Sequence, residues 1–170
     1  AKKYTGTIFV TLFLFSCGIQ KNKVIIDNRT NNEILIGKCD RKGFYKEYFS
    51  GWFNSEYNNY KPDKEIIEKL DNNERMNKIK IFIIFGTWCH DSKRELPRFF
   101  KIEDQLENVK INYKLVGVDT KKSSRDNSIG EIEFTRIPTF IFYEGDEEIG
   151  RIVESTEISL EQDISAIITK

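Results

Sequence analysis

The second half of the chain alternates between apolar runs typical of strands and apolar positions at helical spacing. The run Lys80–Phe85 is almost entirely apolar, as in a strand that is covered on both faces. The strands are expected at residues 80–85, 111–118, 139–143 and 148–153, and the helices at residues 91–106 and 159–168. The last two strands are joined by a short turn that contains Gly145, which predicts a β-hairpin. The order βαβ followed by ββα predicts a small α/β domain.

An aromatic-rich stretch precedes this region. Its side chains form two adjacent rows with a spacing of four, which places them on one broad face of a helix. The rows are Phe44, Tyr48 and Trp52, and Tyr45, Phe49 and Phe53. We expect this helix to pack on the main core, and a ligand-stacking surface is the alternative. A short strand at residues 33–37 precedes the stretch, and a second helix at residues 63–70 follows it.

The first residues have the pattern of an export signal. Lys2 and Lys3 precede a short apolar stretch at residues 8–15, which is too short for a permanent membrane span. The stretch ends in residues 14–18, LFSCG, which resemble a bacterial lipobox. This resemblance implies that Cys17 is lipidated and that the protein is anchored in the bacterial cell envelope, facing the periplasm. An ordinary signal peptide with Cys17 merely nearby is the alternative.

Composition and charge limit the partners. Lysine plus arginine and aspartate plus glutamate both total 27, so the formal net charge is zero, and nothing indicates a basic face for nucleic acid. The hydrophobic content of 39% is sufficient for one core. We expect a signal peptide at residues 1–17, a tether and N-terminal extension at 18–78, and the α/β domain at 79–170.

Lipidation of Cys17 would leave Cys39 and Cys89 as free thiols in an oxidising compartment, where they could pair. Cys89 lies at the expected start of a helix, where unpaired N–H groups and the helix dipole favour the nucleophilic thiolate. Ser92 is expected to donate a hydrogen bond to this thiolate. Asp91 opposes the effect with its negative charge, and His90 contributes little.

Four features occur in order in this half of the chain. They are the pair Trp88-Cys89 after a buried strand, Pro97 eight residues beyond the cysteine, the segment Ile137-Pro138-Thr139, and a hairpin that leads into a terminal helix. Together they resemble the thioredoxin family. The resemblance implies a thioredoxin-like α/β fold, with a central mixed β-sheet flanked by helices and, in this chain, an aromatic-rich helical N-terminal extension. It also implies a cis peptide bond before Pro138, facing Cys89, and a substrate groove formed by Trp88, Ile137 and Thr139.

The chain departs from the family pattern in three places. Ser92 replaces the second cysteine of the usual dithiol, so Cys89 cannot complete exchange within its own motif. Ile83 stands where many thioredoxins have a buried acid. The segment 119–136 is short and polar, so we expect the helix that is usual there to be reduced.

These features predict a membrane-anchored thiol–disulfide oxidoreductase or isomerase that forms a mixed disulfide at Cys89 with substrate proteins or thiols of the cell envelope. Release would come from Cys39, from a substrate thiol or from a small thiol. Cys39 as a small buried apolar residue without a redox role is the alternative. The rival function is a non-catalytic binding module for envelope proteins.

Other chemistries are disfavoured. A zinc site from Cys39, Cys89, His90 and Asp91 would need ligands at adjacent positions, which lack the usual separation. A peroxidase would need a neighbouring threonine and arginine arrangement that is not evident. No cofactor is implied.

Overall fold

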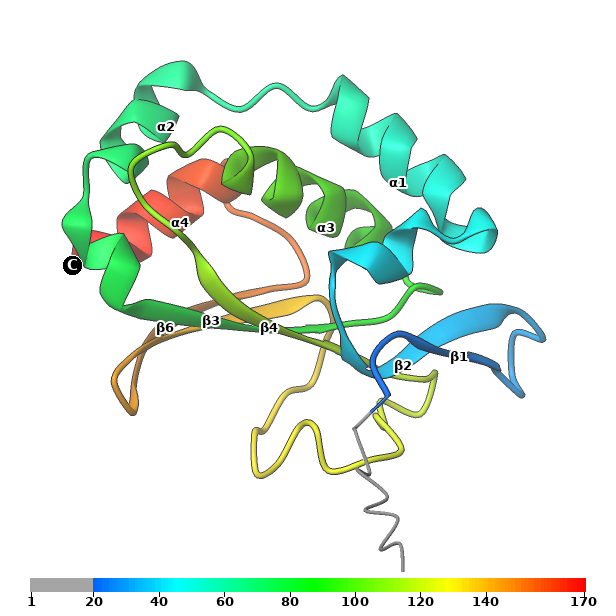
Figure 1. Ribbon diagram of the computed structural model, residues 1–170. Coiled ribbons are helices and arrows are strands. Elements are labelled where there is room, and N and C mark those ends of the chain that lie inside the picture. The colour runs from blue at the N-terminus through cyan, green and yellow to red at the C-terminus, as the bar shows by residue number, and fades with distance from the viewer. Residues whose placement is uncertain (1–19) are drawn as a thin grey trace, which may run out of the picture.

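The computed structural model describes residues 20–170, which form one six-stranded sheet with a layer of helices on one side (Figure 1). The strands are β1 (Lys23–Ile26), β2 (Glu33–Cys39), β3 (Ile79–Phe85), β4 (Asn112–Gly117), β5 (Thr139–Glu144) and β6 (Glu147–Val153). The helices are α1 (Glu47–Asn59), α2 (Lys64–Asp71), α3 (His90–Glu103) and α4 (Leu160–Ile168), with 3-10 turns at Arg41–Tyr45 and Glu74–Lys78. The strand order is β1-β2-β4-β3-β5-β6. The predicted thioredoxin-like α/β architecture is confirmed.

The central strand β3 explains the apolar run in the sequence. It pairs with β4 in parallel and with β5 antiparallel, so its backbone is bonded on both sides. Alternate side chains point to opposite faces of the sheet. Ile81, Ile83 and Phe85 enter the core beneath the helices, which we call the helix-side core. Phe82 and Ile84 enter a smaller cluster on the other face, the opposite-face cluster, which also contains Val116, Val118, Ile137 and Ile141.

The N-terminal segment is part of the same sheet. Strands β1 and β2 form an antiparallel hairpin, and β2 also pairs with β4 so that Gly37 lies opposite Gly117. A Cβ atom on Gly117 would lie 2.5 Å from the Leu35 carbonyl oxygen, so this close approach requires glycine. The boundary expected at residue 79 therefore does not separate two structural units. Strand β1, which has only four residues, was not predicted.

The aromatic stretch packs into the helix-side core as expected, with one change in its helix. Helix α1 begins at Glu47, so Phe44 lies in the preceding 3-10 turn. Phe44, Phe49 and Phe53 are buried, whereas Tyr48 is 65% exposed. The ring of Phe44 contacts Phe53, Phe85, Phe100 and Trp52, with centroid distances of 5.3, 5.3, 5.9 and 6.1 Å. The N-terminal segment and α3 therefore share one core.

A buried carboxylate joins the β1–β2 hairpin to the loop after β4. Asp27 accepts hydrogen bonds from the backbone N–H groups of Arg29, Thr30 and Thr120 at 3.0, 3.0 and 3.2 Å, and from the Thr120 hydroxyl. Burial on its own would raise the pKa of Asp27, but these hydrogen bonds lower it to about 2. Asp27 is thus ionised at neutral pH, and it holds the hairpin near the end of the sheet where β3 and β4 finish.

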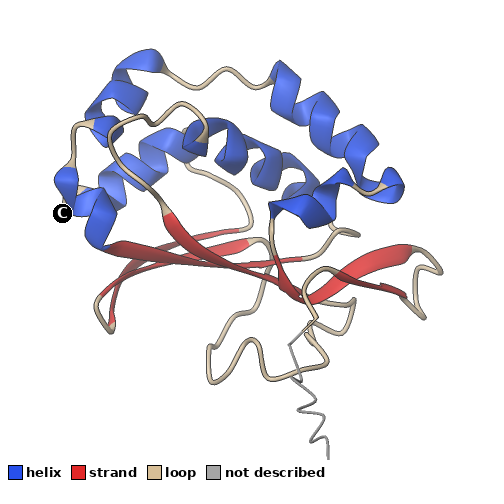
Figure 2. Cartoon of the chain, in the orientation of Figure 1, coloured by secondary structure: helices blue, strands red, loops and turns tan. Residues whose placement is uncertain are grey.

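The other face of the sheet is crossed by a loop. Between Gly117 and Thr139 the chain forms no helix and runs below the sheet in Figure 2, so the helix that we expected to be reduced is absent from this segment. Ile129, Ile132 and Phe134 pack from this loop against the opposite-face cluster. One face of the sheet is therefore covered by helices and the other by irregular chain.

The predicted signal segment and the lipidation site at Cys17 lie outside the described residues. Within residues 20–170, none of the helices has the length and apolar character needed to cross a membrane.

Candidate functional site

The site lies in the connection between β3 and α3, where neighbouring side chains pack closely around Gly86. A Cβ atom on Gly86 would lie 2.6 Å from the Trp88 indole nitrogen and 2.8 Å from the Ile137 side chain. Only glycine fits there without a shift of these neighbours. The Gly86 carbonyl accepts a hydrogen bond from the Cys89 N–H at 2.9 Å, which closes the turn that leads into α3. Backbone packing therefore fixes where the cysteine enters the helix.

Cys89 is the N-cap residue of α3, with an extended backbone (φ −87°, ψ 131°). Its side chain is half-buried, and its thiol donates a hydrogen bond to the Ile137 carbonyl at 3.4 Å. The Ile137–Pro138 peptide bond is cis, as the resemblance implied. The thiol therefore lies between the N-terminus of a 14-residue helix and the proline turn. The half-buried sulfur can be reached from solvent at this position.

Ser92 was expected to donate a hydrogen bond to the Cys89 sulfur, and the structure places its hydroxyl elsewhere. Its side chain is fully buried, and its hydroxyl oxygen accepts a hydrogen bond from the Gly86 N–H at 3.2 Å. Among the described residues, the hydrogen bond of the Cys89 sulfur goes to Ile137 and not to Ser92. Ser92 therefore braces the turn behind the cysteine instead of contacting the sulfur.

Cys39, the second predicted thiol, is held away from Cys89. It is 7% exposed and donates a hydrogen bond to the Gly37 carbonyl at 3.4 Å. Burial raises the pKa of Cys39 to about 12, so the thiol stays protonated at neutral pH. Its ladder partner Leu115 pairs in turn with Ile83, and all three side chains lie in the helix-side core.

Cys89, by contrast, packs against the opposite-face cluster, and both cysteines are free thiols. The structure therefore does not bring Cys39 and Cys89 together. Cys39 fits the alternative that the sequence left open, a small buried residue of the core.

Asp91, Arg94 and Glu95 form a charged group in the first turns of α3. Asp91, in the first turn of α3, forms an ion pair with Arg94 at 2.8 Å, and Arg94 also bonds to the buried Glu95 at 2.6 Å. Two carboxylates thus share the Arg94 guanidinium. His90 is exposed, and its side chain forms no hydrogen bond with another described residue.

The three residues predicted for the substrate groove differ in access. The side chains of Ile137 and Thr139 are buried, and the Thr139 hydroxyl donates a hydrogen bond to the Arg136 carbonyl at 2.7 Å. Trp88 is half-buried, and its indole N–H donates to the Val118 carbonyl at 2.9 Å. Of the three side chains, Trp88 therefore presents the most surface to a substrate.

A cavity of about 280 Å³ lies beside Trp88, and the N-terminal segment supplies much of its wall. Tyr48, Phe49 and Trp52 of α1 line it together with Lys93 of α3, whose ammonium lies 5.9 Å from the centre of the Trp52 ring. The helical spacing of these aromatic residues predicted that they pack in the core, with a ligand-stacking surface as the alternative. The structure divides them, with Phe49 largely in the core and Trp52 and Tyr48 at the cavity.

Within residues 20–170, no three histidine, cysteine, aspartate or glutamate side chains are grouped as metal ligands. The chemistry that the described site offers is that of a single accessible thiol.

A family model described as thioredoxin matches residues 45–161. The chain belongs to the thioredoxin family. The match begins in the N-terminal segment, which agrees with the integration of that segment into the sheet and the core. Membership of the thioredoxin family supports a general role in thiol–disulfide redox chemistry.

Two curated relatives carry thioredoxin names. A thioredoxin-like protein of Acanthamoeba polyphaga mimivirus is 29% identical over 84 residues, which are 49% of this chain and 58% of the viral protein. Thioredoxin H9 of Arabidopsis thaliana is 29% identical over 101 residues, which are 59% of this chain and 68% of the plant protein. The match to the viral protein thus spans little more than half of its length.

Two solved structures are similar in fold. A protein of unknown function from Pseudomonas aeruginosa has a TM-score of 0.51 and 18% identity, over 79% of this chain and 83% of its own. An HIV epitope scaffold has the same TM-score and identity, over 79% of this chain and 84% of its own. At this identity the likeness concerns the fold alone.

Proposed function

We propose that this thioredoxin-family protein is a single-thiol oxidoreductase or isomerase that exchanges disulfides through a mixed disulfide at Cys89. The observation that carries the proposal is the contrast between the two thiols. Cys89 is partly accessible at a helix N-terminus beside the cis Ile137–Pro138 turn, whereas Cys39 is buried with a raised pKa.

The first step is an attack by the Cys89 thiolate on one sulfur of a substrate disulfide. A new S–S bond forms between Cys89 and the substrate, the substrate's own S–S bond breaks, and the departing sulfur leaves as a thiolate that takes a proton from water. Because position 92 is serine, no neighbouring sulfur in the motif can attack the mixed disulfide. A second substrate thiol or a small thiol such as glutathione then attacks it, and Cys89 leaves as a thiolate.

This cycle favours rearrangement over net reduction. When a thiol of the same substrate attacks the mixed disulfide, the substrate leaves with a different pairing of its sulfurs and no net change in oxidation state. The cavity beside Trp88 gives the protein a surface for a side chain next to the substrate disulfide. Its lining combines aromatic rings with polar groups such as Asn32 and Lys93, which favours a side chain with both apolar and polar atoms there.

The first experiment compares the release of substrate from the mixed disulfide in the native chain and in Ser92→Cys. For the native chain, we expect release to require added glutathione and its rate to rise in proportion to glutathione concentration. In Ser92→Cys, the new thiol can form a disulfide with Cys89, so release without glutathione should be at least ~10-fold faster than in the native chain. The mixed disulfide is formed with a fluorescent disulfide peptide. Mass spectrometry then measures both release rates as the loss of the protein–peptide adduct with time.

Cys39→Ser is the matched control for this experiment, since it removes the other thiol of the described chain. Its release rate should equal that of the native chain at every glutathione concentration. Slower release in Cys39→Ser would show that Cys39 resolves the mixed disulfide and would overturn the single-thiol cycle.

Attachment to the cell envelope through Cys17 is part of the proposal, and it rests on the lipobox-like residues 14–18. In a bacterial host fed labelled palmitate, the native chain should incorporate label and Cys17→Ser should not. Equal labelling of both would exclude Cys17 as the lipidation site.

The second candidate function is a non-catalytic binding module for envelope proteins. The aromatic cavity beside Trp88 favours it, because such a surface can hold a partner without any exchange of sulfur.

A further inference from the structure

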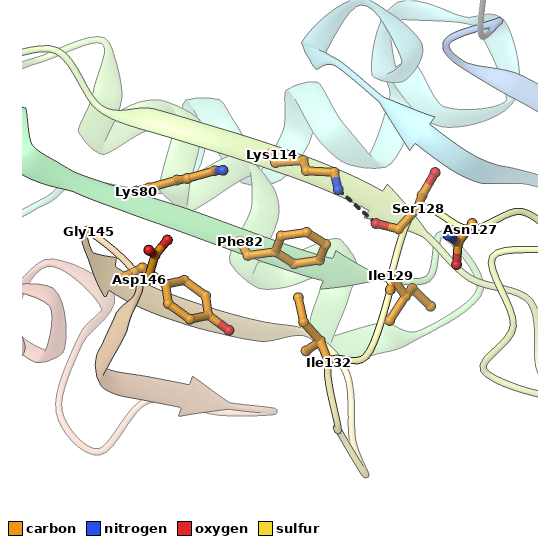
Figure 3. Close-up of a pocket in the computed structure, with 11 residues that line it drawn as sticks. Lys80, Phe82, Lys114, Asn127, Ser128, Ile129, Ile132, Gly145 and Asp146 are labelled. Carbon is orange, nitrogen blue, oxygen red and sulfur yellow. Dashed lines mark hydrogen bonds between the residues drawn. The ribbon is translucent and has the colours of Figure 1, made fainter.

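A second cavity, of about 310 Å³, lies on the face of the sheet that carries no helix (Figure 3). Its lining comes from β3, β4, the loop after β4 and the β5–β6 hairpin, and Cys89 is not part of it. Phe82 and Tyr143 provide aromatic surface, and Ile129 and Ile132 of the loop provide an aliphatic wall. The cavity exists because irregular chain, and not a helix, crosses this face of the sheet.

Two lysines from neighbouring strands line this cavity. Lys114 of β4 lies directly opposite Phe82 in the ladder, and Lys80 of β3 is two residues before Phe82, on the same face. The Lys114 ammonium lies 4.6 Å from the centre of the Phe82 ring and donates a hydrogen bond to the Ser128 carbonyl at 2.8 Å (Figure 3). An aromatic floor with two ammonium groups beside it is thus built into the sheet.

These positive charges are not neutralised by the part of the chain that the structure describes. Neither lysine is within ion-pair distance of a carboxylate among residues 20–170, and this includes Asp146 at the rim of the cavity. Burial lowers the pKa of Lys114, and the nearby cations of Lys38 and Lys80 lower it further, against a smaller opposite effect of Asp126. An anion in the cavity would relieve both the repulsion and the loss of hydration.

We propose that this cavity binds a small organic anion with a flat aromatic body and one carboxylate-like group. The flat body would lie against Tyr143 and the aliphatic wall of Ile129 and Ile132, and the anionic group would lie between the ammonium groups of Lys80 and Lys114. The volume is at the lower end of the range for small-molecule sites, which limits the ligand to one or two fused rings. The site is separate from the thiol and does not depend on the redox proposal.

The test uses a matched pair of probes, 2-naphthoate and the neutral 2-naphthamide, which differ in charge and hardly in shape. Titrations of the ¹⁵N-labelled 170-residue chain followed by NMR give both affinities and locate the binding residues. We expect saturable shifts at the amides of Gly130 and Gly145, and an affinity for 2-naphthoate at least ~10-fold higher than for 2-naphthamide. Equal affinities, or shifts confined to other parts of the chain, would overturn the proposal.

Two substitutions then test whether the ammonium groups of Lys80 and Lys114 bind the anionic group of the probe. Lys80→Met and Lys114→Met should each weaken 2-naphthoate binding about 5- to 10-fold and leave 2-naphthamide binding unchanged. Lys80 makes no side-chain hydrogen bond to a described residue, so Lys80→Met remains informative if Lys114→Met loosens the loop at Ser128. Lys110→Met, an exposed lysine outside the cavity, is the control and should bind both probes as the native chain does.

Disulfide exchange measured on Lys80→Met separates this proposal from the redox function. We expect a native exchange rate in a variant that has lost anion affinity. If Lys80→Met binds 2-naphthoate with native affinity, the anion site is excluded whatever the exchange rate.

Discussion

Replacement of Cys89 by serine is expected to lower the rate of disulfide exchange by roughly 10³-fold or more, because it removes the nucleophile itself. A serine hydroxyl has nearly the shape of the thiol, and it can still donate to the Ile137 carbonyl that the thiol contacts at 3.4 Å. The fold should therefore survive while the chemistry is lost. The rate is measured by exchange between a fluorescent disulfide peptide and glutathione, with and without the protein.

The control for this prediction is Cys39→Ser, which also removes one sulfur. Because Cys39 is buried in the helix-side core, this variant should keep an exchange rate within about threefold of the native rate, with some loss of stability from the buried hydroxyl. If both variants keep the native rate, the redox function is excluded. If Cys89→Ser also retains every partner that the native chain captures, the binding module becomes the better description.

Replacement of Phe44 by alanine is expected to lower the free energy of unfolding by about 3–5 kcal/mol, the usual cost of deleting a buried phenylalanine ring. Phe44 is 0% exposed and contacts rings from α1, β3 and α3. The cavity left behind would therefore open between the N-terminal segment and the rest of the protein. Urea unfolding followed by circular dichroism measures the change.

The matched control is Tyr48→Ala in the same aromatic stretch. Tyr48 is 65% exposed, so its loss should change the free energy of unfolding by no more than about 0.5 kcal/mol. Phe44→Ala should also unfold in a single transition, since the segment before residue 79 shares both sheet and core with the rest. Two separate transitions, or equal effects of the two substitutions, would show that the segment folds as an independent unit.

The sequence by itself was sufficient for the elements from β3 to α4. Their signals are local: the apolar run of β3, the helical spacing of α3, and the glycine turn between β5 and β6 lie within a few residues of one another. The candidate nucleophile Cys89 could also be predicted from the sequence. The pair Trp88-Cys89 and the segment Ile137-Pro138-Thr139 occur at recognisable places between those elements.

Only the tertiary structure decided the roles of the residues around the nucleophile. Cys39 became a core residue because β2 pairs with β4 beneath the helices, and Ser92 turned to the Gly86 N–H instead of the sulfur. The hydrogen bond that the Thr120 N–H donates to Asp27 joins segments that are 93 positions apart in the chain. Hydrogen bonds and burial between distant segments depend on how the elements pack, and no local pattern of residue types carries that information.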